Sequence, residues 1–125
     1  MGQTNFGTIV ENDATKEDIT GDKTLDEEDV GKVLNVTAAA TITLPGTTLG
    51  YVYQIVNDGA DAAFAVTVSP ASADKIMGPD ITDVDNKDLV NTAVTAANGD
   101  RLTLFGDGSL GWYVISQVGT WAREA

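Results

Sequence analysis

Apolar and polar residues alternate along most of the chain from residue 32 onward. In "ATITLP" (residues 40–45), Ile42 and Leu44 fall on one side of an extended backbone, and Thr41 and Thr43 fall on the other. The same two-residue period recurs in "KVLNV" (32–36), "YVYQIV" (51–56), "FAVTVSP" (64–70), "RLTLF" (101–105) and "WYVISQV" (112–118). Because the side chains of a β-strand point alternately to opposite faces, this period predicts strands that bury one face.

Turn sequences separate these segments, among them "NDGAD" (57–61), "ANGD" (97–100) and "GDGSLG" (106–111). Asn98-Gly99 is a hairpin signal, which predicts that a strand over 92–96 pairs with the strand over 101–105. Residues 71–92 are polar and irregular, which indicates a long loop with one short strand near Ile76. About eight short strands at this spacing predict an all-β fold, an antiparallel β-sandwich or barrel.

One short helical turn is predicted near residues 25–30. Thr24 and Glu27 have the spacing of a capping box, and Gly31 stands where a helix would end. Asp26, Glu27, Glu28 and Asp29 fall in this turn, where the helix dipole favours negative charge.

The first 18 residues have few apolar side chains and no helical period, so we expect an extended N-terminal arm (1–18) before one β-domain (19–125). Only "TNFGTIV" (4–10) has the character of a strand. The N-terminal sequence has neither the basic start nor the apolar core of a secretory signal, and no apolar run is long enough to predict a membrane span.

Cysteine and histidine are both absent from the 125 residues. This excludes disulfides, thiolate or imidazole metal ligands, and catalytic triads built on either residue. We therefore expect no enzymatic activity, no cofactor and no catalytic residue.

The net charge is −12, and residues 1–29 hold nine acids against two lysines. Such a charge repels nucleic acids and anionic membranes, so neither is an expected partner. This acidic N-terminal region either keeps the protein soluble or is complementary in charge to a basic surface of a partner.

Two groups of acids are candidate sites. Asp80, Asp83, Asp85 and Asp88 could bind calcium, although Asp88 and Val94 stand where an EF-hand loop starting at Asp83 needs Gly and Glu. A solvated acidic loop is the alternative. Asp26, Glu27, Glu28 and Asp29 could supply a glycosidase pair, but adjacent acids on one helical turn are expected to face water.

Three aromatic residues lie close together near the end of the chain: Trp112, Tyr113 and Trp121. They are candidates for an oligomer interface, where tryptophan is enriched. The alternatives are that the tryptophans cap their own sandwich or that they form a platform for sugars.

Two stretches resemble virion proteins of tailed bacteriophages. "TLDEEDVGKVLNVTAAATITLP" (24–45) opens the similar region and "NGDRLTLFGDGSLGWYVISQVGTW" (98–121) closes it, so that the resemblance covers about residues 20–121. Such patterns occur in head decoration (capsid cement) proteins and in domains of tail fibres. The chain lacks the tandem domains, collagen-like stretches and coiled coils of a whole fibre, and so it looks more like a decoration protein.

The resemblance implies a structural virion protein on the outer capsid surface, which stabilises the phage head as a homotrimer bound to the major capsid protein. The capsid-binding residues would be Thr4, Asn5, Phe6, Ile9 and Val10, added as a strand to a capsid subunit. The alternative is that the arm pairs with its own domain or with a neighbouring subunit. The alternatives are a glycan-binding module of a tail fibre and a small carboxylate-dependent glycosidase.

Overall fold

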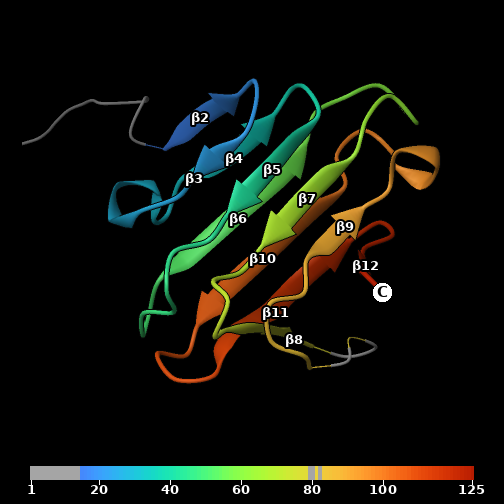
Figure 1. The fold of residues 1–125 in the computed structure, drawn as a ribbon. Helices are drawn as coiled ribbons and strands as arrows, with labels where there is room; N and C mark the ends of the chain where they lie inside the picture. The colour runs from blue at the N-terminus through green and yellow to red at the C-terminus, as the bar shows by residue number, and fades with distance from the viewer. Residues whose placement is uncertain (1–14, 79–80, 82) are drawn as a thin grey trace, which may run out of the picture.

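The computed structural model describes residues 15–78, 81 and 83–125, which form two packed β-sheets (Figure 1). One sheet has the strand order β2-β4-β6-β10-β11-β8, and the other has the order β12-β9-β7-β5-β3. The strands are β2 (Lys16–Ile19), β3 (Lys23–Thr24), β4 (Val33–Val36), β5 (Ala40–Thr43), β6 (Val52–Asn57), β7 (Val66–Ser69), β8 (Lys75–Met77), β9 (Leu89–Asn91), β10 (Arg101–Gly106), β11 (Gly111–Val118) and β12 (Ala122–Arg123). The predicted all-β fold is confirmed.

The sheets are mixed, so the prediction of an antiparallel sandwich is wrong for about half of the strand pairs. From β2 to β10 every strand lies in the sheet opposite to its predecessor. This makes β2, β4 and β6 parallel neighbours in one sheet and β3, β5 and β7 parallel neighbours in the other. A two-residue period reports which face is buried and not which way the neighbouring strand runs.

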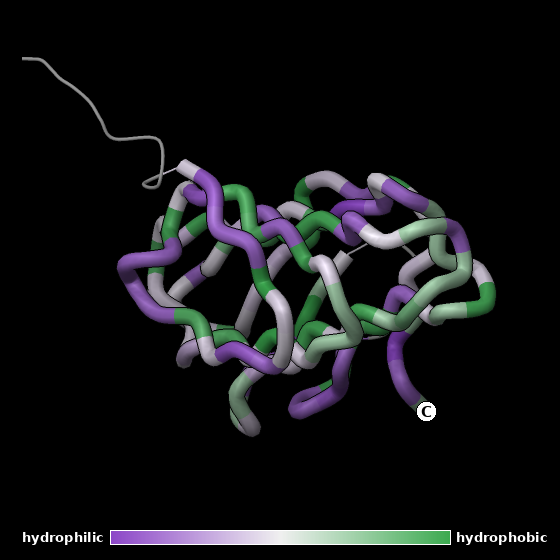
Figure 2. The backbone as a smooth tube through the Cα atoms, turned by 90° about the horizontal axis from the view of Figure 1, so that it is seen from above, coloured by the Kyte–Doolittle hydropathy of each residue, from purple (hydrophilic) through white to green (hydrophobic). Residues whose placement is uncertain are grey.

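The inward faces of both sheets form one core. Ile42 and Leu44 are buried as the alternation predicts, and they meet inward residues of the other sheet such as Leu34, Ile55 and Leu104. Figure 2 shows hydrophilic and hydrophobic stretches alternating along the backbone. At roughly 25 cal/mol per Å² of apolar surface, burial of these side chains is the main favourable term in folding.

The segment after residue 88 differs from the prediction. Leu89–Asn91 is the strand, and the expected strand over 92–96 is a 3-10 helix, η4 (Ala93–Thr95). Asn98-Gly99 joins η4 to β10 rather than closing a hairpin, because β9 and β10 belong to different sheets. The short strand expected near Ile76 is confirmed as β8.

The predicted helical turn is confirmed as the 3-10 helix η3 (Glu27–Asp29), but its N-cap is Asp26 and not Thr24. The backbone N–H of Glu28 donates to Asp26 Oδ1 at 2.9 Å, and that of Asp26 donates to Asp29 Oδ2 at 3.1 Å. A carboxylate takes the place of a hydroxyl in this capping box because both accept from the first turn. Gly31, at φ +82, follows the turn as predicted.

Residues 16–18, which the sequence assigned to the arm, belong to β2 and pair with β4, and the rest of the predicted arm up to residue 14 lies outside the described residues. The candidate capsid-binding residues Thr4, Asn5, Phe6, Ile9 and Val10 lie outside the described residues.

Candidate functional site

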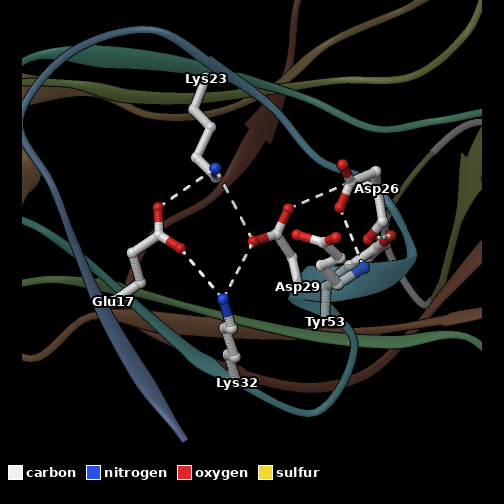
Figure 3. Close-up of polar contacts among 7 residues, drawn as sticks. Glu17, Lys23, Asp26, Asp29, Lys32 and Tyr53 are labelled. Atoms are coloured by element: carbon white, nitrogen blue, oxygen red, sulfur yellow. Dashed lines mark hydrogen bonds and ion pairs between the residues drawn. The ribbon is translucent and has the colours of Figure 1, made fainter. Parts of the chain in front are cut away.

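Four charged side chains meet where β2, β3 and the start of β4 come together (Figure 3). In this four-charge cluster, defined as Glu17, Lys23, Asp29 and Lys32, each carboxylate contacts both lysines. Glu17 lies 3.1 Å from Lys23 Nζ and 3.2 Å from Lys32 Nζ. Asp29 Oδ1 lies 3.7 Å from each ammonium group. The cluster is therefore charge-balanced.

Its pKa shifts favour the charged forms. Burial opposes ionisation of Glu17, but hydrogen bonds from Lys23 and Lys32 and their positive charges together lower its pKa. The hydrogen bond to Glu17 raises the pKa of Lys23 against the opposing effect of burial, with a further contribution from Asp29. The pKa of Glu17 thus shifts away from the raised value of a general acid, and the pKa of Lys23 shifts away from the lowered value of a nucleophilic amine.

The prediction that the acids of the helical turn face water is wrong for Asp29. It is one of the buried polar residues of the fold, and two lysines and the N–H of Asp26 stabilise its carboxylate. Asp26 is occupied as an N-cap, and its carbonyl oxygen accepts from the Tyr53 hydroxyl at 2.7 Å. Burial, followed by the charge of Asp29, raises the pKa of Tyr53. Asp26 and Asp29 therefore stabilise the helical turn, and Asp29 also lies against the two lysines that contact Glu17 of β2.

A second polar cluster was missed by sequence reasoning. Asn57, Asn91 and Asp100 are buried and come from β6, β9 and the turn before β10. The Nδ2 group of Asn91 donates to Asp100 Oδ2 and to the carbonyl oxygen of Thr120, both at 3.0 Å, and Asn57 Nδ2 donates to Asn91 Oδ1 at 2.8 Å. The cluster joins the two sheets, and no local sequence pattern signals a contact between positions this far apart.

The candidate calcium ligands that lie in the described residues belong to no group of three or more acidic side chains that could hold a metal ion. Asp85 pairs with Lys75 at 3.2 Å, and the backbone N–H of Asp88 donates to Glu124. Asp80 lies outside the described residues. Among the residues that the structure describes, no three carboxylates gather in the way a cation site requires.

Of the three aromatic candidates, two lie in the core and one lies at the surface. Trp112 is fully buried, with its ring centroid 5.4 Å from that of Tyr53. Trp121 is also buried, and its Nε1 donates to the carbonyl oxygen of Val118 at 3.1 Å. Both indoles are therefore core residues of their own chain, and of the three only Tyr113 offers an exposed side chain. Neither tryptophan is available as a platform for sugars.

No model of a known protein family and no curated protein matches this sequence. Within the described residues, no helix combines the length and the apolar character needed to cross a membrane.

Proposed function

We propose that this protein is a head decoration protein of a tailed bacteriophage, which binds the outer capsid surface and stabilises it. In this role the protein acts through its surfaces, and it needs neither a cofactor nor a catalytic cleft. It associates with the major capsid protein and with further copies of itself.

The observation that carries the proposal is where the two virion-like segments lie in the fold. Residues 24–45 supply η3, β4 and β5, and residues 98–121 supply β10, β11 and the buried Trp121. Leu34, Ile42 and Leu104 from these segments are fully buried. The shared pattern is thus made of core, cap and turn residues from both sheets, which supports a likeness of the whole domain and not of one local loop.

The internal polar contacts support a binding protein over an enzyme. The side chains of the four-charge cluster and of the cluster around Asn91 contact other groups of the same chain. The carboxylate of Asp107 accepts hydrogen bonds from three backbone N–H groups of its own turn. These hydrogen bonds, above all from Gly111 and Ser109, lower the pKa of Asp107. Polar groups used in this way stabilise the fold and leave its surfaces for recognition.

The test begins by asking whether a gene next to that of this chain encodes a major capsid protein. If so, the chain is co-sedimented with empty heads assembled from that capsid protein. The full chain should sediment with the heads and raise their unfolding temperature. Deletion of residues 2–12 tests the arm, and a chain with residues 2–12 in scrambled order is the matched control for length and composition. Heads that bind no protein would refute the proposal, whereas unchanged binding by both variants would refute only the role of the arm.

A glycan-binding tail-fibre module is the competing function. Binding of the pure protein to a glycan array, together with no binding to heads, would favour it.

A further inference from the structure

The Asn98-Gly99 pair, which does not close the hairpin that its sequence predicts, is chemically labile. In such a pair the backbone nitrogen of the glycine can attack the side-chain carbonyl carbon of the asparagine, because glycine has no side chain to hinder the approach. Of the asparagines in the 125 residues, only Asn98 is followed by glycine. Asn98 is also exposed to water, which the complete reaction needs. The pair is therefore a candidate site of spontaneous deamidation.

Asn98 is held in place by the turn that follows β6. Its backbone N–H donates to Asp61 Oδ1 at 3.0 Å. Its side-chain Nδ2 donates to the carbonyl oxygen of Gly59 at 2.8 Å and to Asp58 Oδ1 at 3.3 Å. These hydrogen bonds fasten both the backbone and the amide group of Asn98 to the turn over 57–61.

The nitrogen that would attack is also occupied. The Gly99 N–H donates to the carbonyl oxygen of Asn57 at 2.8 Å. Asn57 is buried and is itself fixed, because its Nδ2 donates to Asn91 Oδ1 and its backbone N–H donates to the carbonyl oxygen of Asp100, both at 2.8 Å. A nitrogen that is bonded in this way can turn toward the side chain of Asn98 only after the local turn has opened.

We propose that Asn98 is a site of spontaneous deamidation whose rate is set by the opening of the turn that contains it. When the turn opens, the Gly99 nitrogen bonds to Cγ of Asn98, the proton of that nitrogen passes through solvent to the amide nitrogen, and ammonia leaves. Water then opens the resulting succinimide ring and gives aspartate or isoaspartate. The reaction needs no partner other than water.

The other labile pairs of the chain are better protected. Two Asp-Gly pairs occur, at 58–59 and 107–108. In the first pair the glycine N–H donates to Asn57 Oδ1 at 2.9 Å, and in the second it donates to Thr47 Oγ1 at 3.1 Å. A carboxylate is also a poorer electrophile than an amide at neutral pH. Asn98 is therefore the site that reacts first.

Deamidation changes what the side chain can bind. The Nδ2 group of Asn98 donates hydrogen bonds, whereas the carboxylate of the product only accepts them. This carboxylate would face the carbonyl oxygen of Gly59 and the carboxylate of Asp58, which accept as well. It would also add one negative charge to a chain whose net charge is already −12. The modified chain should therefore lose the contact between residue 98 and the turn over 57–61.

The test is peptide mapping by mass spectrometry of the full chain after incubation in mildly alkaline buffer, either folded or unfolded in guanidinium chloride. Asn98 should convert at least roughly tenfold more slowly in the folded chain, because several hydrogen bonds must break before the turn opens. The other asparagines serve as internal references. Equal rates in the two states, or faster conversion at another asparagine, would overturn the proposal.

Two variants test whether the local turn sets the rate. Asp61→Ala removes the acceptor of the Asn98 N–H at an exposed position, and Asp83→Ala makes the same change at an exposed residue after β8. Asp61→Ala should speed conversion of the folded chain by roughly threefold or more and leave the rate in guanidinium chloride unchanged. Asp83→Ala should change neither rate. Equal rates in the two folded variants, or no conversion of Asn98 in either, would overturn the proposal.

The effect of the modification is tested with Asn98→Asp. Asn86→Asp is the matched control, because it adds the same charge at another exposed asparagine. The amide hydrogen of Gly99 should exchange with solvent at least roughly tenfold faster in Asn98→Asp than in Asn86→Asp. Equal exchange in the two variants would overturn the loss of contact that is expected to follow deamidation.

Discussion

Changing each tryptophan to phenylalanine tests whether the two indoles stabilise the chain that contains them. The two sites are matched, because both side chains are buried and the exchange deletes the same atoms. They differ in the state of the indole N–H. Trp121 Nε1 donates to Val118 at 3.1 Å, while Trp112 Nε1 has no acceptor among the described residues.

The magnitudes follow from this difference. Loss of buried atoms and the cavity left behind cost about 1–3 kcal/mol at either site. Trp121→Phe also loses a hydrogen bond with a net value of about 1 kcal/mol. Trp112→Phe instead removes an unpaired buried donor, which recovers about 1 kcal/mol or more of its desolvation cost. Trp121→Phe should therefore reduce the free energy of unfolding by about 2 kcal/mol more than Trp112→Phe.

The assay is equilibrium urea unfolding followed by far-ultraviolet circular dichroism, which does not depend on tryptophan emission. Sedimentation of both variants checks that the change acts on folding and not on association. Equal costs at the two sites, or a larger cost for Trp112→Phe, would refute the hydrogen-bond reasoning. Unchanged stability with lost association would show that the indoles serve an interface.

Three further changes test the polar contacts of the fold. Glu17→Gln should lower the free energy of unfolding by about 1 kcal/mol at neutral pH. Because the folded-state pKa of Glu17 is lowered, the stabilisation by Glu17 is complete above its unfolded pKa of about 4.3 and is lost as the pH falls through the folded-state pKa. The free energies of unfolding of the two proteins, measured by urea titration, should therefore become equal in acid. Gly119→Ala should destabilise by about 2 kcal/mol or more, since φ is +93 and a Cβ would collide with Asp100, whereas Gly21→Ala, with open space around it, should stay within about 0.5 kcal/mol in the same thermal melts. Asn91→Ala should cost about 2–4 kcal/mol by urea unfolding because it leaves buried partners unpaired, and a cost below about 1 kcal/mol would contradict the role of this cluster.

The sequence predicts the inward faces of the strands well. Ile42, Leu44 and Leu104 alternate with residues that face outward, and alternation is a local property that survives in the fold. Among the described residues, β10 and β11 are the consecutive strands that form a hairpin within one sheet, and this feature is also local, because Asp107 and the glycines of the turn "GDGSLG" close it.

Features that depend on distant residues were not predictable. The parallel pairing of β5 with β7 follows from strands that alternate between sheets, and nothing in either segment encodes it. The sequence around Asp29 is that of a solvated acid. Lys23 and Lys32 come to lie beside it only through the pairing of β2 and β3 with their neighbouring strands, which the local sequence does not show. The exposure of Tyr113, Ile115 and Val118 was not predictable either, because the two-residue period indicates that one face of 112–118 is buried and leaves open which side chains stay exposed.

The most direct test of the proposed function is a cryo-electron microscopy reconstruction of empty heads incubated with the purified full chain. The proposed function predicts additional density of the size of this β-sandwich on the outer surface, repeated at symmetry-related positions of the capsid lattice. Heads that remain bare at saturating protein, or protein that is found only on tails, would contradict it.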